Sequence, residues 1–478
     1  MKPAAEPTIA ALLLRLAQME RAMLEMRQAY ELRIAALEAE NAALKAENKT
    51  LKEKIARLEK DSSNSGLPPS SDIAPPEKQP KPKSGRKIGG QPGHKMHART
   101  PFPPEQVDAT ITHTISKEEQ SLRGLTFLRF DKHQQVELKD RPCDIVEHHR
   151  AVYRDPLGNL VFADWNNPTH VGLFGPKMKA MVASLNISCH ASVRNLQQFL
   201  RDVFVLPVST GYLCKALAQT SEAIAPAWQE AKDAAPNQKH AWMDETGHKQ
   251  NGDGRKWWCW ALVADTFTFF AIRASRGRQV VYEILGAAFE GVLHCDYFTA
   301  YVHIDKDGSW KIQHCIAHLL RDLQWLADHP DATVARWGAW LKTSLCHVLA
   351  WHKNGWRDDA MRMKDALLYW TTEYMTPKHV DAESMAKRLR KDGDRYFRFL
   401  WDPLAEPTNN KAERAIRPTV LHRKCTQGTR GDTGQRWWER AWTVVASCRQ
   451  QERSSFQFFS QALVAQAHGL ACPSLLVV

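Results

Sequence analysis

A seven-residue repeat of apolar residues dominates the first part of the chain. Leucine recurs at every seventh position, and isoleucine or asparagine occupies the other seam position of each heptad. The seam residues include Leu37, Asn41, Leu44, Asn48, Leu51 and Leu58. With leucine at d, the g and e′ residues of a parallel dimer are opposite in charge, and paired asparagines at a favour two strands in register. The pattern predicts a parallel coiled coil over residues 9–60, the alternative being one amphipathic helix packed against its own chain.

The composition changes after Lys60. Residues 61–100 are rich in serine, proline and glycine, which predicts a flexible linker without a core. Between positions 78 and 99 this linker carries seven lysines or arginines and no acidic residue. Such an arm can neutralise phosphates with little sequence information, the alternative being a solvated segment without a partner. The residues expected to bind DNA are Lys81, Lys83, Arg86, Lys87 and Lys95.

Residues 101–167 follow the linker and predict a small β-rich module. Alternating apolar and polar residues at 109–115 and 159–165 are typical of strands, and the segment DPLGN predicts the turn before the second one. No residue pattern in this module indicates a catalytic or binding function.

Residues 168–235 predict a helical region. Within it, two helices flank a short turn at 206–209. This arrangement is typical of a helix-turn-helix, which would present Thr210, Tyr212 and Lys215 to a DNA groove. The alternative is a helix pair that serves only for packing.

Beyond position 236 the pattern changes to that of a sheet. The expected strands span 240–246, 255–265, 266–275 and 291–296, with a helix at 277–289 before the last one. This order predicts a ribonuclease-H-like core in a multidomain α/β chain, with the first and fourth strands parallel and side by side. Residues 236–315 would form the first part of this core, 316–405 an α-helical insertion, and 406–478 the rest of the core with C-terminal helices.

This sheet would bring two acidic residues together. Asp244 lies near the end of the first strand and Asp296 ends the fourth, so we expect both carboxylates at neighbouring strand ends. Two close carboxylates repel each other unless a cation lies between them, and Mg²⁺ or Mn²⁺ prefers such oxygen ligands. Glu245 points to the opposite face of its strand and is the second choice. We therefore expect Asp244 and Asp296 to be catalytic metal ligands.

Glu413 is the candidate for a third acidic ligand. It follows two asparagines at the start of a predicted helix, and basic residues surround it. We expect these bases to hold a DNA backbone: Arg414, Arg417, Arg423 and Lys424. The alternative is a capping box in which Asn410 begins the helix and Glu413 completes the cap. Three acids holding two cations would serve in-line phosphoryl transfer, first to water and then to a 3′ hydroxyl.

Cys315 and His318 share one face of the helix that begins the predicted insertion. A structural zinc site takes four ligands, so this pair alone predicts no zinc. We place His318 near the active site, where it would contact the scissile phosphate or orient a water molecule. Packing in the core is the alternative.

Composition narrows the class of protein further. The 478 residues carry a net charge of +12, which favours a polyanionic partner. Ten cysteines include no C-x-x-C pair, so neither a disulfide framework nor a zinc ribbon is expected. No run of about 18 apolar residues occurs, which predicts no membrane span. The expected location is the reducing cytoplasm, in association with the nucleoid.

Several further motifs occur together along the chain. They are SSNSGLPPSSD, GRKIGGQPGHK, DET, GVLHCDYFTAY, CIAHLLRDL and NNKAERAIRP, the last followed by HRK. In combination they resemble the motifs of transposases of the insertion sequence 66 (IS66) family, which are DDE enzymes. The resemblance implies strand cleavage and strand transfer at the ends of an insertion sequence. It also implies that Asp244, Asp296 and Glu413 carry two Mg²⁺ or Mn²⁺ ions.

The resemblance has further implications for motifs and partners. Cys315 and His318 correspond to the family's C-x-x-H motif. A zinc module often follows the linker in this family, but only Cys143 remains at 101–167, so we expect a metal-free remnant and no zinc. The implied partners are double-stranded DNA of the transposon ends and the target, a second or further copy of the chain through the coiled coil, and accessory proteins of the element.

Two other functions stay open from the sequence. One is a transposase-derived DNA-binding protein that no longer cuts, and the other is a ribonuclease-H-like nuclease or junction resolvase. The presence of all three acids favours an active enzyme. The coiled coil, the basic arm and the long insertion together favour a transposase over a nuclease.

Overall fold

The computed structural model divides the chain into two compact units. It describes residues 9–60, 101–139, 142–164, 172–304, 310–371 and 376–476. The first unit comprises Met1–Pro76, Val171–Ser192 and Cys214–Val478, and the second comprises Glu77–His170 and Val193–Leu213. The basic residues of the linker lie outside the described residues, so their role in DNA binding stays a prediction.

The N-terminal repeat forms helix α1 (Ile9–Leu58), which is continuous over 50 residues. Its seam leucines are exposed, Leu44 and Leu51 among them. A helix that packed its seam against its own chain would bury these residues, so that alternative is not what the structure shows. The helix is confirmed, and the parallel dimer stays a prediction.

The second unit contains little regular structure in its described residues. Its elements include the 3-10 helix η2 (Pro104–Gln106), α2 (Lys117–Leu122) and the antiparallel hairpin β1 (Val152–Arg154) and β2 (Leu160–Phe162). Asp155 closes the hairpin turn, because its carboxylate accepts the Asn159 N–H at 2.8 Å. The strand predicted at 109–115 is not formed: among the described residues no strand pairs with it. A strand without a neighbour leaves its backbone N–H and C=O groups without partners. The alternation of apolar and polar residues is therefore not sufficient to form a strand.

The predicted helix pair is present. α4 (Val193–Phe204) precedes α5 (Thr210–Ala223), and the Gln197 side chain donates a hydrogen bond to the Val208 carbonyl across the start of the turn at 2.8 Å. α3 (Pro176–Ile187) comes before the pair and α6 (Ala225–Ala234) after it. Recognition of a DNA groove by this pair stays a prediction.

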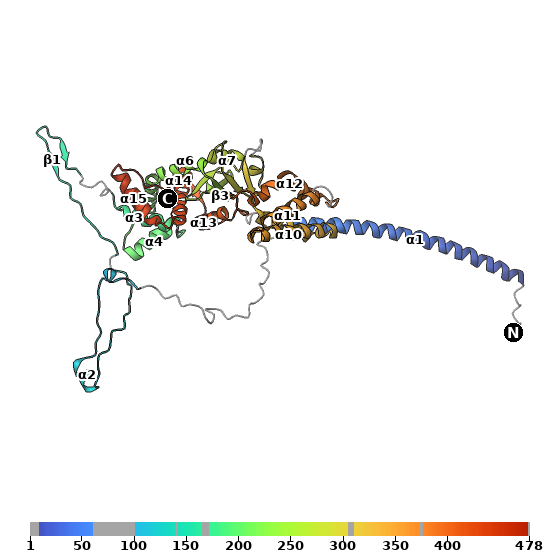
Figure 1. Ribbon diagram of the computed structural model, residues 1–478, viewed down its shortest axis with the longest axis horizontal. Helices are drawn as coiled ribbons and strands as arrows, with labels where there is room; N and C mark the ends of the chain where they lie inside the picture. The colour runs from blue at the N-terminus through green and yellow to red at the C-terminus, as the bar shows by residue number, and fades with distance from the viewer. Residues whose placement is uncertain are drawn as a thin grey trace, which may run out of the picture. The chain divides into compact units, whose positions relative to one another are not determined.

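A mixed five-stranded sheet forms the centre of the first unit (Figure 1). Its strands are β3 (His240–His248), β5 (Trp257–Val263), β6 (Thr268–Arg273), β7 (Val292–Cys295) and β8 (Lys311–His314). Their order is β6-β5-β3-β7-β8, with β6, β5 and β3 antiparallel and β3, β7 and β8 parallel. The prediction that the first long strand and the strand before Asp296 lie side by side and parallel is confirmed.

Helices cover both faces of this sheet. α7 (Arg278–Leu285) and the short α8 (Thr299–Val302) pack on one face, where α7 buries an apolar stripe at helical spacing. α13 (Asn410–Thr426) packs on β3 and β5, and Ala412 contacts Trp242 on that side. Two short strands, β4 (Gln250–Asn251) and β9 (Thr429–Arg430), pair in parallel and tie β3 to the end of α13.

Side chains of α14 (Gly431–Gln450) satisfy the edge strand β6. The backbone N–H groups of Thr268, Phe270 and Ile272 each donate to an α14 side chain. The acceptors are Ser447, Thr443 and Glu439. They recur every fourth residue of the helix, a rise of about 6 Å, which matches the rise of about 6.7 Å between alternate strand residues. α14 thereby closes an edge that would otherwise offer unpaired donors; α15 (Ser455–Ala467) packs behind it.

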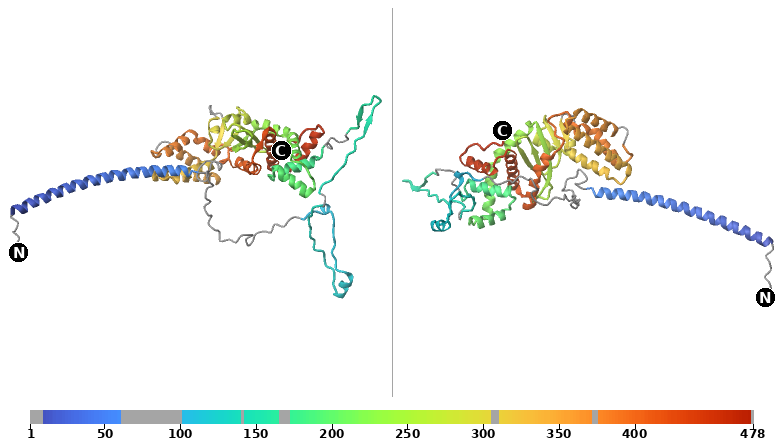
Figure 2. Two further views of the ribbon diagram at one scale, coloured as in Figure 1. Left: turned by 180° about the vertical axis from the view of Figure 1, so that it is seen from behind. Right: turned by 60° about the horizontal axis from the view of Figure 1, so that its bottom comes forward.

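Four helices follow β8 and form the predicted insertion. They are α9 (Ile316–Ala327), α10 (Ala332–Lys353), α11 (Arg357–Tyr369) and α12 (Val380–Phe397), and the 3-10 helix η6 (Arg398–Leu400) leads back to the sheet. They share a core of their own, built from residues such as Leu319, Leu341 and Leu389. Figure 2 shows from two further sides that the C-terminal end of α1 lies beside these helices. Among the described helices, none combines the length and the apolar character needed to cross a membrane.

Candidate active site

Asp244 and Asp296 lie at adjacent positions of the central sheet. Asp244 belongs to β3, and Asp296 directly follows β7, which pairs with β3 in parallel so that Trp242 lies opposite His294. Both carboxylates are half-buried. The Oδ1 atom of Asp244 accepts the next residue's N–H at 2.9 Å, and the Oδ1 atom of Asp296 accepts the Phe298 N–H at 3.0 Å. Each carboxylate thus keeps one oxygen outside these local hydrogen bonds.

The two aspartates share an environment that disfavours negative charge. Burial raises the pKa of Asp244 well above its ordinary value, and the charges of Glu245, Asp296 and Glu413 raise it further. Burial and the Glu245 charge raise the pKa of Asp296 to about 7, with a smaller contribution from Glu413. Repulsion from Glu413 thus acts on both aspartates, although among the described residues the close donor atoms that group with Glu413 belong to Cys315 and His318 and not to the aspartates. A divalent cation would relieve this repulsion, as expected of a metal-binding carboxylate group.

The start of α13 brings Glu413 to the sheet. Asn409, which precedes this helix, is buried, and its Nδ2 donates to the Met243 carbonyl of β3 at 2.7 Å. The helix begins at Asn410, and the side chain of the residue before it makes no capping bond, so the capping box that was the alternative role of Glu413 is not formed. Asn409 fixes the start of α13 against β3 instead, one residue before Asp244. That contact directs Glu413, in the first turn, toward the site.

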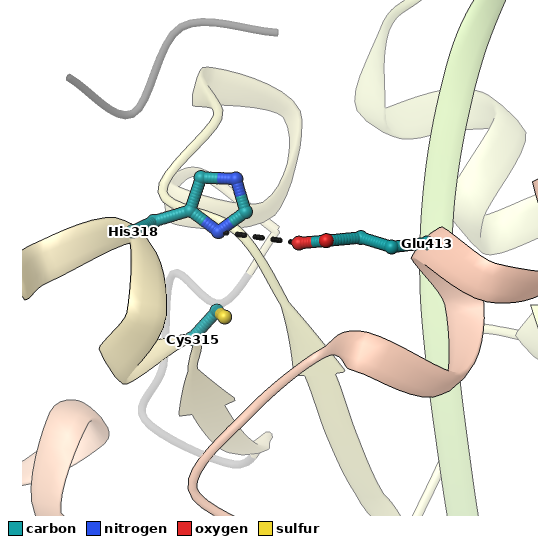
Figure 3. A group of neighbouring side chains, drawn as sticks. All are labelled: Cys315, His318 and Glu413. Carbon is teal, nitrogen blue, oxygen red and sulfur yellow. Dashed lines mark ion pairs between the residues drawn. The ribbon is translucent and has the colours of Figure 1, made fainter. Parts of the chain in front are cut away.

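Cys315, His318 and Glu413 form a group of candidate ligands (Figure 3). One donor atom from each lies within 4.8 Å of the others. His318 Nδ1 faces Glu413 Oε1 at 3.6 Å, and neither atom has a hydrogen-bond partner within the described part of the chain. Cys315 is buried and its Sγ accepts the Asn409 N–H at 3.2 Å. Glu413 thus adds a third donor to the Cys315 and His318 pair, which no sequence spacing indicated.

The ionisation of this group follows from burial. Burial, and to a smaller extent the charge of Arg321, lowers the pKa of His318 to about 4, so the ring is neutral at neutral pH. Burial raises the pKa of Glu413, whose side chain is 38% exposed, while Arg321 and Arg417 oppose that rise. A bound cation would give His318 Nδ1 and Glu413 Oε1 a common partner, and it would stabilise the ionised Glu413 carboxylate. The group therefore fits a site that holds a cation.

Glu245 has a different role from its neighbour. It is buried, and it accepts hydrogen bonds from Arg276 at 2.8–2.9 Å and from the Tyr301 hydroxyl at 2.7 Å. The guanidinium of Arg276 lies over the Phe298 ring at 3.7 Å, its side chain is 27% exposed, and its charge lowers the pKa of Asp296. The charge of Glu245 nevertheless raises the pKa of both Asp244 and Asp296, so the expectation that it faces away from the metal ligands stays a prediction. Arg276 is a cation beside the site that no sequence pattern indicated.

The basic residues of α13 do not share one environment. Arg414, Arg417 and Lys424 are exposed. Arg423 is half-buried, and its Nη1 donates to Thr246 Oγ1 of β3 at 3.3 Å. One of its N–H groups is thus engaged between α13 and the sheet, and its role as a phosphate contact stays a prediction. The burial of every third or fourth position along the inner face of α13 explains the difference.

Comparisons with known proteins show the family to which most of the described core is similar. Residues 171–436, more than half of the chain, match the model of a family described as "Transposase IS66 family". Residues 11–100 match a family of unknown function (DUF6444). A protein of Sinorhizobium fredii (strain NBRC 101917 / NGR234), described as uncharacterized protein y4qI, is 25% identical over 246 residues. That match covers 46% of this chain and 45% of the relative, so the chain spans less than half of the relative's length.

Proposed function

Because this chain belongs to the Transposase IS66 family, we propose that it binds the ends of an insertion sequence and catalyses DNA cleavage and strand transfer by a DDE mechanism. The observation that supports this proposal is the parallel pairing of β3 with β7, which brings Asp244 and Asp296 to neighbouring positions, together with Glu413 in the first turn of the helix that packs on β3. The sheet order β6-β5-β3-β7-β8 supports a ribonuclease-H-like core for this chemistry.

Asp244, Asp296 and Glu413 are the proposed ligands of two Mg²⁺ or Mn²⁺ ions. When bound, the ions would activate the attacking oxygen and stabilise the leaving oxygen of an in-line phosphoryl transfer. The three carboxylates are oxygen donors, which these hard cations prefer over the thiol of Cys315. We therefore assign Cys315 to the wall of the site and expect no zinc.

His318 is proposed as a positioning residue for Glu413. Its ring is neutral at neutral pH, so one ring nitrogen carries a proton and the other accepts. Nδ1 lies 3.6 Å from Glu413 Oε1, just beyond hydrogen-bond distance, so a small approach of the two groups would let an Nδ1–H donate to the carboxylate and hold it in one orientation. In that tautomer Nε2 has no proton and can accept a hydrogen bond from a water molecule. In the other tautomer Nε2 carries the proton and could donate to the scissile phosphate.

The exposed cations of α13 are the proposed contacts to the DNA backbone. Arg414 and Arg417 lie within about one turn of Glu413 on the same helix, so a phosphate held by them would be close to that ligand, whereas Lys424 lies about 16 Å further along the helix and would contact the backbone beyond it. The basic arm of the linker and the helix pair α4 and α5, with Thr210, Tyr212 and Lys215, are proposed to add affinity elsewhere on the duplex. Accessory proteins of the element are further proposed partners, and the cytoplasm with its nucleoid is the proposed location.

A strand-transfer assay tests the proposed function. Purified protein, Mg²⁺ or Mn²⁺, and a labelled duplex with the inverted repeats that flank this reading frame would be incubated with a supercoiled target. The proposal predicts joining of the 3′ end of the labelled strand to the target. Hydrolysis without joining would indicate a nuclease, and binding without cleavage would indicate an inactive DNA-binding derivative.

A further inference from the structure

The last turns of α1 form ion pairs with the helical insertion. Lys49 Nζ lies 2.8 Å from Asp331 Oδ2, at the start of α10. Arg57 Nη2 lies 3.1 Å from Asp381 Oδ2, in the first turn of α12. These contacts join residues about 280 and 324 positions apart in one chain. They therefore define a surface of the insertion that receives α1.

Between these two ion pairs lie further contacts. Trp325, near the end of α9, donates its Nε1–H to the Ala56 carbonyl at 3.4 Å, and Lys60 Nζ lies over the indole ring at 4.3 Å. Glu53 Oε1 lies 3.6 Å from His379 Nε2. The contact between α1 and the insertion thus combines charged pairs with a lysine ammonium that lies over the face of an indole ring.

Two histidines of this contact surface could be taken for metal ligands. His329, His379 and Asp381 place one donor atom each within 4.8 Å of one another. However, Nδ1 of each histidine accepts a backbone N–H, from Asp331 at 3.0 Å and from Asp381 at 3.3 Å. The remaining Nε2–H groups then face Asp381 and Glu53, so the group is satisfied without an ion. These rings serve the contact with α1.

All of these α1 residues lie on the side of the helix away from its seam. In the heptad that places Leu51 at d, the contact residues take positions b, c and f: Lys49 and Ala56 at b, Arg57 at c, Glu53 and Lys60 at f. Positions b, c and f point away from the partner helix in a two-stranded coiled coil. Docking on the insertion and pairing through the seam therefore use different faces of one helix.

The seam remains exposed along the same turns. Leu51, Ile55 and Leu58 are 47%, 52% and 77% exposed, although the outer face of those turns contacts the insertion. Further toward the N-terminus, a shallow groove of about 370 Å³ follows the seam. Its lining residues are Ile34, Leu37, Glu38, Asn41, Ala42 and Lys45. An apolar stripe of this length with two polar a positions matches a second copy of the same helix.

We propose that α1 uses both faces at once, its b, c and f face being fixed to the insertion of its own chain while its a and d face pairs with α1 of a second copy. The proposal has two halves: the pairing half is the contact between the two α1 helices, and the docking half is the contact of α1 with the insertion of its own chain. The pairing half rests on the proposed coiled-coil dimer, whereas the docking half does not. By the two-fold symmetry of a parallel pair, the two insertions lie on opposite outer sides of the coiled coil.

The consequence concerns the two active sites of the dimer. α9 begins directly after Cys315 and carries His318 in its first turn, and it carries Trp325 in its last. One helix of about 18 Å thus connects the site to the α1 contact. The coiled coil, and not the linker, would set the distance between the two catalytic units.

Zero-length crosslinking of the full-length protein tests both halves. Protein labelled with ¹⁴N and ¹⁵N is mixed, allowed to exchange subunits, and treated with a carbodiimide, which joins touching amines and carboxylates as amides. The Lys49–Asp331 crosslink should form with one isotope only, because both residues belong to one chain. The seam pair Glu47 at g and Lys52 at e′ should give crosslinked peptides that carry both isotopes.

Each departure from this result has one meaning. Absence of the Lys49–Asp331 crosslink, with mixed-isotope seam crosslinks present, would overturn the docking half and leave the dimer intact. A mixed-isotope Lys49–Asp331 crosslink would overturn docking within one chain. Absence of mixed-isotope Glu47–Lys52 peptides would overturn the pairing half alone. The matched control is Asp331→Asn, which keeps a capping residue at α10 and should lose the Lys49 crosslink completely.

Discussion

Binding of Mn²⁺ at the candidate site should depend on pH, because the cation competes with a proton on Asp296. Burial and the Glu245 charge raise the pKa of this carboxyl to about 7. At pH 6 about one tenth of the carboxyl groups are ionised, and at pH 8 about nine tenths are. The apparent affinity for Mn²⁺ should therefore rise about tenfold between these pH values, or about 1.4 kcal/mol. The raised pKa of Asp244 acts in the same direction.

The raised pKa of Asp296 also makes the stability of the metal-free protein depend on pH. A carboxyl with a raised pKa keeps its proton in the folded protein between its ordinary value of 3.8 and about 7, while the unfolded chain loses it. Its contribution to stability is therefore complete below 3.8 and is lost as the pH rises to about 7. Bound Mn²⁺ should replace this stabilisation above pH 7.

Electron paramagnetic resonance of free Mn²⁺ measures the affinity directly at both pH values. His318 has a pKa of about 4 and does not titrate in this window, so a change between pH 6 and pH 8 reports on the carboxyl groups. In the Asp296→Asn protein, binding should weaken and the contribution of Asp296 to the pH dependence should vanish. Equal affinity of the unmodified protein at pH 6 and pH 8 would refute the reasoning.

Three further perturbations follow from the structure and the basic arm. Thr443→Val should lower the free energy of unfolding by about 1–3 kcal/mol, because it leaves the buried Phe270 N–H without an acceptor; Thr443→Ser is the control in chemical denaturation. Glu245→Ala should destabilise the fold by several degrees in melting temperature, since Arg276 and Tyr301 lose their partner, and an unchanged melting temperature would contradict the pairing. Deleting residues 78–99 should flatten the slope of log affinity for DNA against log salt by about 0.9 for each phosphate that the arm neutralises, and an unchanged slope would remove the arm from the interface.

The sequence was sufficient where one local periodicity determined the structure. The heptads of α1 and the apolar runs of β3 and β7 specify helix and strands by themselves, and the order of the strands predicts which two are neighbours. Asp244 and Asp296 could be predicted as neighbours in this way, because β3 and β7 run parallel: Asp296 directly follows β7, and Asp244 lies in β3 two residues beyond the Trp242 and His294 pair.

Contacts between distant segments could not be predicted in this way. Asn410 was the expected helix cap, but Asn409 holds the cap position, and its side chain bonds to β3, 166 positions away. Glu245 was expected only to face away from the metal ligands, but it holds Arg276, which lies beyond the next two strands. Residues 109–115 alternate like a strand but form none, because pairing depends on a partner that the alternation does not encode. In each case the tertiary neighbour decided what the residue does.

Cleavage by single-residue variants tests the central claim most directly. Asp244→Asn, Asp296→Asn and Glu413→Gln should each cleave a labelled end duplex at least about a hundredfold more slowly in Mg²⁺ or Mn²⁺, because a missing ligand removes several kcal/mol of stabilisation from the transition state. Binding of the duplex should stay within about twofold, since none of these carboxylates is a proposed phosphate contact. Asp265→Asn, at the opposite end of the sheet beside His240, is the control and should cleave normally. Full cleavage by the Glu413→Gln protein would contradict the assignment of the site.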